Sequence, residues 1–243
     1  MALDTLLASV LPALILAGYI ILKDKASPEP VKMLLAAFCL GMLSAPASML
    51  ISCPLGWIGA YSDDPSTLSG LFLKALYAAA VPEETAKFIA LWIVVRRNGD
   101  FNEYFDGLVY AVCVSMGFAA LENIMYLADA GENWMNVGLM RGILSVPSHY
   151  ADAVLRGFFF SLAMFGSRNT GLNGALTLLA PILAHALFDW VCFSISASSA
   201  SGSFITVTVI AGLAAFIWLQ RLVRRKVREH LALDNGERNG TSA

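Results

Sequence analysis

The stretch Val81-Pro82-Glu83-Glu84-Thr85-Ala86-Lys87-Phe88 places three ionisable side chains in the middle of a long apolar run. The run extends from Leu71 to Val95 and is otherwise apolar except for Lys74 near its start. A run of this length crosses a bilayer as a helix, and each charge within it costs several kcal/mol unless it faces a polar cavity. On a helix the lysine can pair with either glutamate. A structural ion pair explains one glutamate and leaves the other unpaired, so the stretch indicates a functional site.

Composition defines the class of protein around this stretch. The chain has 243 residues, of which 58% are apolar and 14% charged, and its mean hydropathy is +0.67. Soluble domains carry about 25% charged residues. The net charge of −2 gives no reason to expect a nucleic-acid partner. The four cysteines show no CxxC spacing, so a thiolate metal site is not expected. The sequence therefore predicts an all-α polytopic membrane protein.

Hydropathy along the chain predicts seven transmembrane helices. Their predicted bounds are Leu6–Leu22, Met33–Ile51, Leu71–Val95, Leu108–Leu127, Val137–Phe165, Gly174–Ile195 and Phe204–Leu219. Pro82 is expected to kink the third span. Residues 53–67 are expected to form a loop. We expect residues 1–223 to form a single transmembrane domain and residues 224–243 a basic-to-polar cytoplasmic tail.

Basic residues predict the orientation. With an external N-terminus, the inner segments hold 12 of the 16 lysines and arginines, and the outer loops hold none. These twelve are Lys23, Lys25, Lys32, Arg96, Arg97, Arg168, Arg221, Arg224, Arg225, Lys226, Arg228 and Arg238. The positive-inside rule then predicts an external N-terminus and a cytoplasmic C-terminus.

Polar residues gather on the third to sixth spans, which are expected to enclose the site. The fourth span carries Phe118 and Glu122, and the sixth carries His185 and Asp189, four residues apart on one helical face. The fifth carries a polar stripe made of Arg141, Ser145, Ser148, His149, Asp152 and Arg156. At a rise of 1.5 Å per residue, the estimated depths of these acids and imidazoles along their spans lie between the membrane midplane and its outer face. Each group alone could be a helix-joining hydrogen bond, but together they suit water activation, metal binding or a proton relay.

Three motifs resemble a known family. Glu83-Glu84-x-x-Lys87, Phe118-x-x-x-Glu122 and His185-x-x-x-Asp189 resemble, in order, the signature motifs of the PrsW family of bacterial intramembrane proteases. The resemblance covers roughly Leu71 to Trp190. It implies a relative of the type II CAAX prenyl endopeptidases and bacteriocin-immunity proteins, although Glu122 stands where the CAAX enzymes have a histidine. It also implies a protease of the bacterial inner membrane that makes site-one cuts in single-pass proteins such as anti-sigma factors.

The expected mechanism is hydrolysis by activated water. Glu83 or Glu84 is the general base, with Glu83 favoured by its place in the family motif, and Glu122 holds the water or a metal. His185 polarises the scissile carbonyl or stabilises the oxyanion, and Asp189 orients the imidazole from one helical turn away.

Lys87 and His149 support these groups. His149, His185 and Glu122 would form the two-His-one-Glu set of catalytic zinc sites, and a metal-free glutamate mechanism is the competing form. A proton-coupled transporter using the same groups is the alternative from another functional class.

Overall fold

The structure, a computed structural model, describes residues 2–24, 27–62, 66–197 and 202–240, and side chains as far as residue 236. Every regular element in these ranges is helical. Five are single helices: α1 (Leu3–Ile21), α2 (Val31–Trp57), α5 (Tyr104–Asp129), α8 (Thr170–Ser196) and α9 (Gly202–Gly240).

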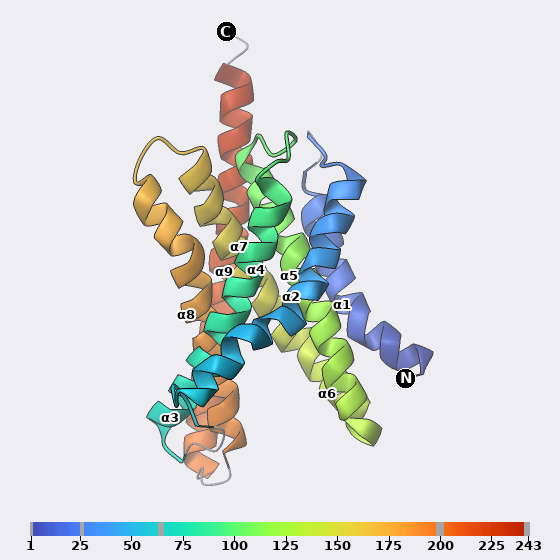
Figure 1. The fold of residues 1–243 in the computed structure, drawn as a ribbon, viewed down its shortest axis with the longest axis vertical. Helices are drawn as coiled ribbons and strands as arrows, with labels where there is room; N and C mark the ends of the chain where they lie inside the picture. Colours follow the sequence, from blue (N-terminus) through green and yellow to red (C-terminus); the bar gives the residue numbers. More distant parts are fainter. Residues whose placement is uncertain (1, 25–26, 63–65, 198–201, 241–243) are drawn as a thin grey trace.

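Two further rods are composite. The first joins α3 (Leu68–Lys74), a π-helical turn η1 (Ala75–Ala80) and α4 (Val81–Val95). The second follows the short 3-10 helix η2 (Gly131–Asn133) and joins α6 (Trp134–Met140), a π-helical turn η3 (Arg141–Ser145) and α7 (Val146–Met164). The seven rods of Figure 1 confirm the predicted all-α membrane fold.

Five helices in the described ranges are long and apolar enough to cross a membrane: α1, α2, α5, α8 and α9. The two composite rods are not among them: each is interrupted by a π-helical turn, which leaves α4 with 15 residues, and α7 carries Asp152 and Arg156 within its 19 residues. The chain is therefore a multi-pass membrane protein in which two interrupted rods carry charged groups in mid-helix.

Helix α5 is the centre of the bundle. In its most apolar 18-residue stretch 78% of residues are buried, against 33% or less for the other candidate spans. It packs against α1, α2, α4 and α7 (Figure 1). Because α5 has neighbours on all sides, its position fixes the depth and rotation of Glu122.

Glycines allow the close approach of helices around α5. A Cβ added to Gly41 of α2 would overlap the carbonyl of Val114, and one added to Gly117 of α5 would overlap the carbonyl of Phe38. Gly107 and Gly157 make the equivalent contact between α5 and α7. Small residues at crossings of membrane helices permit such backbone contact. Gly117 directly precedes Phe118, so this packing also positions the second motif.

A π-helical turn directly precedes each of the two proline-containing site segments. Turn η1 ends at Ala80 before Val81-Pro82, and turn η3 ends at Ser145 before Val146-Pro147. Proline lacks an N–H and its ring crowds the preceding turn, so a wider turn there accommodates it. The sequence predicted a kink at Pro82, and the structure places a π-helical turn at this point. Residues 83 and 149 follow the two prolines and face the bundle interior.

Two boundaries, the C-terminal ends of α2 and α9, differ from the sequence prediction by more than four residues. Helix α2 extends to Trp57 through Cys53 and Pro54, where a loop was expected. Continuing the helix satisfies backbone groups that have no water to bind in a bilayer, which explains the extension.

Helix α9 continues as far as Gly240. Val223 and Val227 are buried, His230 stacks on Phe158, and Asp234 accepts the N–H groups of Tyr104 and Phe105 at the start of α5. Asp234 thus partners N–H groups that lack an acceptor within their own helix. The basic segment after residue 223 is therefore docked on the bundle.

Candidate active site

Glu84 lies at the centre of a buried polar cluster. Its side chain is fully buried, and Oε1 accepts from Nζ of Lys87 at 2.8 Å. The guanidinium of Arg156 donates to Oε2 and to the Glu84 carbonyl oxygen. Nδ1 of His185 lies 2.8 Å from Oε1. Residues from α4, α7 and α8 thus meet at one carboxylate.

Glu83 has fewer contacts and more access than its neighbour. Its Oε2 lies 3.3 Å from Nζ of Lys87 and 3.8 Å from Nε2 of His185, and 14% of its side chain is exposed. The side chain of Glu84 has no exposed area. Of the two glutamates, Glu83 is therefore the one a water molecule or a substrate can reach.

Lys87 joins the first two motifs. Its fully buried ammonium lies 3.1 Å from Nδ1 of His149 and 3.9 Å from the ring centre of Phe118, besides its contacts with the two glutamates. An aromatic face stabilises a desolvated cation. This contact gives Phe118 of the second motif a physical role.

Glu122 lies at the outer side of the cluster. Its Oε2 is 2.7 Å from Nη2 of Arg141 and 2.9 Å from Nε2 of His149. Arg141 also donates to Asn123 at 2.6 Å and lies over the ring of Tyr126. The structure therefore brings Glu122 to His149, and Arg141 fixes its carboxylate.

His185 is surrounded by carboxylates. Nε2 lies 3.3 Å from Asp189 and 3.8 Å from Glu83, while Nδ1 faces Glu84 at 2.8 Å and Asp152 at 3.9 Å. The rings of His149 and His185 are 5.2 Å apart between centres. All seven predicted site and supporting residues therefore lie in one contact network.

Asp152 belongs to this network, although the sequence analysis placed it only on the polar stripe of the fifth span. It is fully buried, and neither carboxylate oxygen has a hydrogen-bond partner among the described residues. The only signal in the sequence was the spacing from Ser148 to Arg156 along one helical face.

Four side chains of the cluster could hold a metal ion. Glu83, Glu84, His149 and His185 each offer one ligand atom, and these atoms all lie within 4.8 Å of one another. Glu122, which the sequence placed in the possible metal set, lies outside this group and contacts it through His149. Two imidazoles with carboxylates are donors typical of catalytic zinc.

Charge in the cluster is unbalanced. Five carboxylates face three permanent cations, which leaves two negative charges when the histidines are neutral. The carboxylates are Glu83, Glu84, Glu122, Asp152 and Asp189, and the cations are Lys87, Arg141 and Arg156. Unpaired buried charge is costly, so protons or a further cation must compensate it.

The cluster lies near the middle of the membrane helices. At 1.5 Å per residue, Glu83 is about 18 Å from the C-terminal end of α4, and His149 is about 22 Å from either end of its rod. Glu122 and Asp189 each lie about 10 Å from the C-terminal ends of α5 and α8. Three acids of the cluster are partly exposed, Glu83 by 14%, Glu122 by 13% and Asp189 by 20%.

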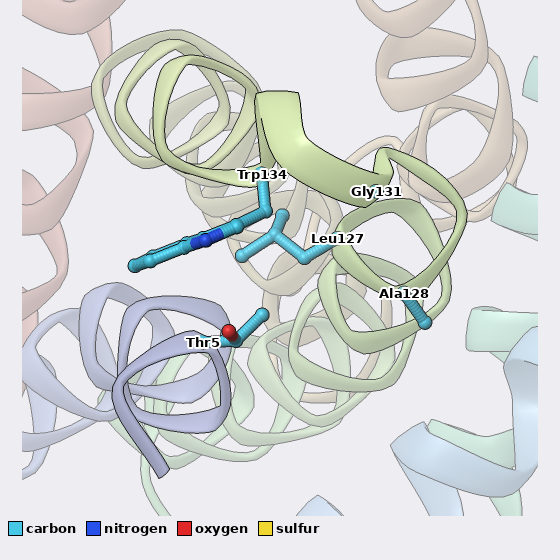
Figure 2. Close-up of a pocket in the computed structure, with 5 residues that line it drawn as sticks. All are labelled: Thr5, Leu127, Ala128, Gly131 and Trp134. Atoms are coloured by element: carbon cyan, nitrogen blue, oxygen red, sulfur yellow. The ribbon is translucent and has the colours of Figure 1, made fainter. Parts of the chain in front are cut away.

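Two other features lie apart from the cluster. Figure 2 shows a pocket of about 220 Å³ between the start of α1 and the outer end of α5, lined by Thr5, Leu127, Ala128, Gly131 and Trp134. It holds no acid or imidazole. At the opposite end of the bundle, Asp24, Glu29 and Asp106 approach one another. Burial raises the pKa of Glu29, whose carboxylate accepts from Tyr110.

The fold and this cluster define a class: a polytopic helical membrane protein with a hydrolase-type acid and imidazole centre inside its bundle. A sequence model described as PrsW family intramembrane metalloprotease matches residues 29–219. The chain belongs to this family, and it is a membrane protease.

Curated relatives support the assignment. The chain is 32% identical to Protease PrsW of Geobacillus kaustophilus over 184 residues, 76% of this chain and 77% of that protein. It is 31% identical to Protease PrsW of Bacillus subtilis over 190 residues, 78% of this chain and 83% of that protein. The match to Protease PrsW of Oceanobacillus iheyensis is 27% identical over 224 residues, 92% and 95% of the two chains. No solved structure matches the chain.

Proposed function

We propose that this protease hydrolyses a peptide bond of single-pass membrane proteins near the extracytoplasmic boundary, as a site-one cut of the anti-sigma-factor type. The observation that carries the proposal is the access to the cluster through Glu83, Glu122 and Asp189. Two of these acids lie about 10 Å from the outer helix ends, so the shorter route for water is from outside. A frayed or extended segment at that edge is the accessible target, since a helical substrate hides its peptide bonds in internal hydrogen bonds.

Glu83 is the proposed general base. It takes a proton from water, and the resulting hydroxide adds to the scissile carbonyl carbon. In the metal-free form His185 stabilises the oxyanion, and Asp189, 3.3 Å from its Nε2, orients the ring. When the C–N bond breaks, Glu83 returns the proton to the leaving amine. Glu84 is less suited to this role because its side chain is fully buried and forms ion pairs with Lys87 and Arg156.

The donor set fits a divalent metal such as zinc. His149, His185 and Glu84 would hold it, which leaves Glu83 as the base. The uncompensated negative charge and the unpartnered oxygens of Asp152 also favour an added cation. When bound, such an ion would polarise the carbonyl and the water.

Lys87 competes for the same donors. Its ammonium contacts Glu83, Glu84 and Nδ1 of His149, which are three of the four possible ligands. Metal binding therefore requires Lys87 to give up part of these contacts. The metal-free glutamate mechanism, in which Lys87 supplies the local positive charge, is the competing form.

A proton-coupled transporter is less well supported. It requires a polar path from the cluster to the inner face. Buried apolar side chains that are 6% exposed or less occupy much of the inner half of the bundle, namely Leu91, Val94, Leu108, Phe158 and Phe160. Arg156, the innermost polar residue of the cluster, donates outward to Glu84.

The proposed setting is the bacterial cytoplasmic membrane, with the N-terminus outside and the C-terminus inside. Residues 1–223 form the membrane domain, and residues 224–243 form a cytoplasmic segment. The distribution of basic residues supports this orientation.

The test is incubation of purified protein with a membrane-anchored candidate substrate. Wild type should cleave it, and Glu83→Gln should not. Chelation followed by zinc replacement should abolish and then restore cleavage if a metal is required. Full activity of metal-free protein would leave the glutamate mechanism, whereas cleavage by Glu83→Gln would refute the proposed base.

A further inference from the structure

Asp152 is an acid of the cluster that is sealed from solvent and receives no hydrogen bond from a described residue. Its side chain is fully buried, and neither oxygen has a hydrogen-bond partner there. Buried polar groups are almost always paired, and a buried carboxylate without a donor carries a large desolvation cost. Such a group needs an explanation in terms of what it faces.

Asp152 faces the imidazole of His185. Oδ2 lies 3.9 Å from Nδ1, on the side of the ring where Glu84 makes its 2.8 Å contact. Arg156, one turn further along α7, directs Nη2 toward Glu84 and leaves Nε and Nη1 without a partner among the described residues. Asp152 therefore faces an imidazole that is already shared between two carboxylates.

A histidine that binds a metal usually donates its other ring N–H to a carboxylate or carbonyl, which fixes the tautomer and the ring orientation. In the proposed donor set Glu84 itself is a ligand, so it is no longer a full acceptor for Nδ1–H. Asp152 is the second carboxylate on that side. A shift of about 1 Å would bring Oδ2 within hydrogen-bond distance.

We propose that Asp152 is a positioning residue, which accepts the Nδ1–H of His185 and orients Nε2 toward the reacting centre when Glu84 binds the metal. The inference rests on the proposed metal-binding function. His185 of the third motif then lies between two carboxylates: Asp152 of α7 faces Nδ1, and Asp189 of α8 faces Nε2.

The test is zinc affinity, measured on purified full-length protein with chelator-buffered zinc alone. Asp152→Asn should weaken zinc binding about 10- to 100-fold, as expected for loss of a carboxylate behind a ligating histidine. Its metal-free thermal midpoint should equal or exceed that of wild type, because the change removes an uncompensated buried charge. Asp234→Asn, which alters a buried acid of α9 in contact with the start of α5, is the matched control and should leave zinc affinity unchanged.

Wild-type affinity in Asp152→Asn would overturn the inference while leaving the metal site standing. A fall in the metal-free midpoint would indicate a structural role and would also overturn it. Absence of tight zinc binding in wild type would refute the metal site and, with it, this role of Asp152. If Asp152→Asn does not fold, Asp152→Ser must show the same loss of zinc affinity.

Discussion

Glu83 and Glu84 are adjacent in the sequence, and neutralising them should have opposite consequences. Glu84→Gln removes the carboxylate that compensates Lys87 and Arg156, both fully buried. Glu83→Gln weakens the contacts with Lys87 at 3.3 Å and with His185 at 3.8 Å, made by a side chain that is 14% exposed. We expect Glu84→Gln to destabilise the fold and Glu83→Gln to leave it intact but inactive.

The magnitude follows from the partners of each group. Breaking a buried ion pair costs about 3–5 kcal/mol because the remaining charge is left uncompensated. Lys87 retains its contact with Glu83 in this variant, so Glu84→Gln should cost about 3 kcal/mol, the lower end of that range. For a chain of this size that loss corresponds to about 6–12 °C in the thermal midpoint. Neutralising Glu83 should cost less, about 1 kcal/mol, because Glu83 is partly exposed and Lys87 keeps its 2.8 Å contact with Glu84.

The assay is thermal unfolding in detergent, followed by tryptophan fluorescence, with cleavage measured on the same samples. The double variant Glu84→Met/Arg156→Met provides the control. It removes the Arg156 guanidinium together with the carboxylate that compensates it, and it should recover much of the stability lost in Glu84→Gln. Equal thermal midpoints for Glu83→Gln and Glu84→Gln would refute the assignment of different roles to the two acids.

Three further predictions concern the scaffold. Gly117→Ala should lower stability by about 1–3 kcal/mol and reduce cleavage, because the added Cβ overlaps the carbonyl of Phe38; thermal unfolding and cleavage assays measure both. Asp234→Ala should cost about 1 kcal/mol, since it removes the acceptor of two N–H groups at the start of α5, and an unchanged thermal midpoint would contradict this contact. A reporter fused after residue 243 should be cytoplasmic, and one inserted near residue 201 should be external; the reverse pattern would contradict the orientation.

The sequence was sufficient to predict the helical architecture and the residues that meet. The intramembrane charges at Glu83, Glu84 and Lys87 indicated a functional polar site, and the four-residue spacing of His185 and Asp189 placed these two on one helical face. These inferences depend only on the length of an apolar run and on helix periodicity, which is why the structure agrees with them.

The contacts between side chains of different helices could not be predicted from the sequence in the same way. The sequence does not state that Arg141 fixes Glu122, that Arg156 crosses to Glu84, or that Phe118 covers Lys87. These contacts depend on the relative rotation of the rods, which the π-helical turns and the glycine contacts of α5 set. The helical continuation of α2 through Pro54 was also missed, because proline is usually read as a helix end.

The most direct test of the central claim is mass spectrometry of the fragments produced from a single-pass substrate by wild type and by Glu83→Gln. The account predicts one cut in the extracytoplasmic juxtamembrane segment or the outer end of the span, made by wild type only. Moving the susceptible segment inward by two helical turns, about 11 Å, should abolish it. Cuts in the cytoplasmic half of the span, or the same cut by Glu83→Gln, would contradict the proposed site and its depth.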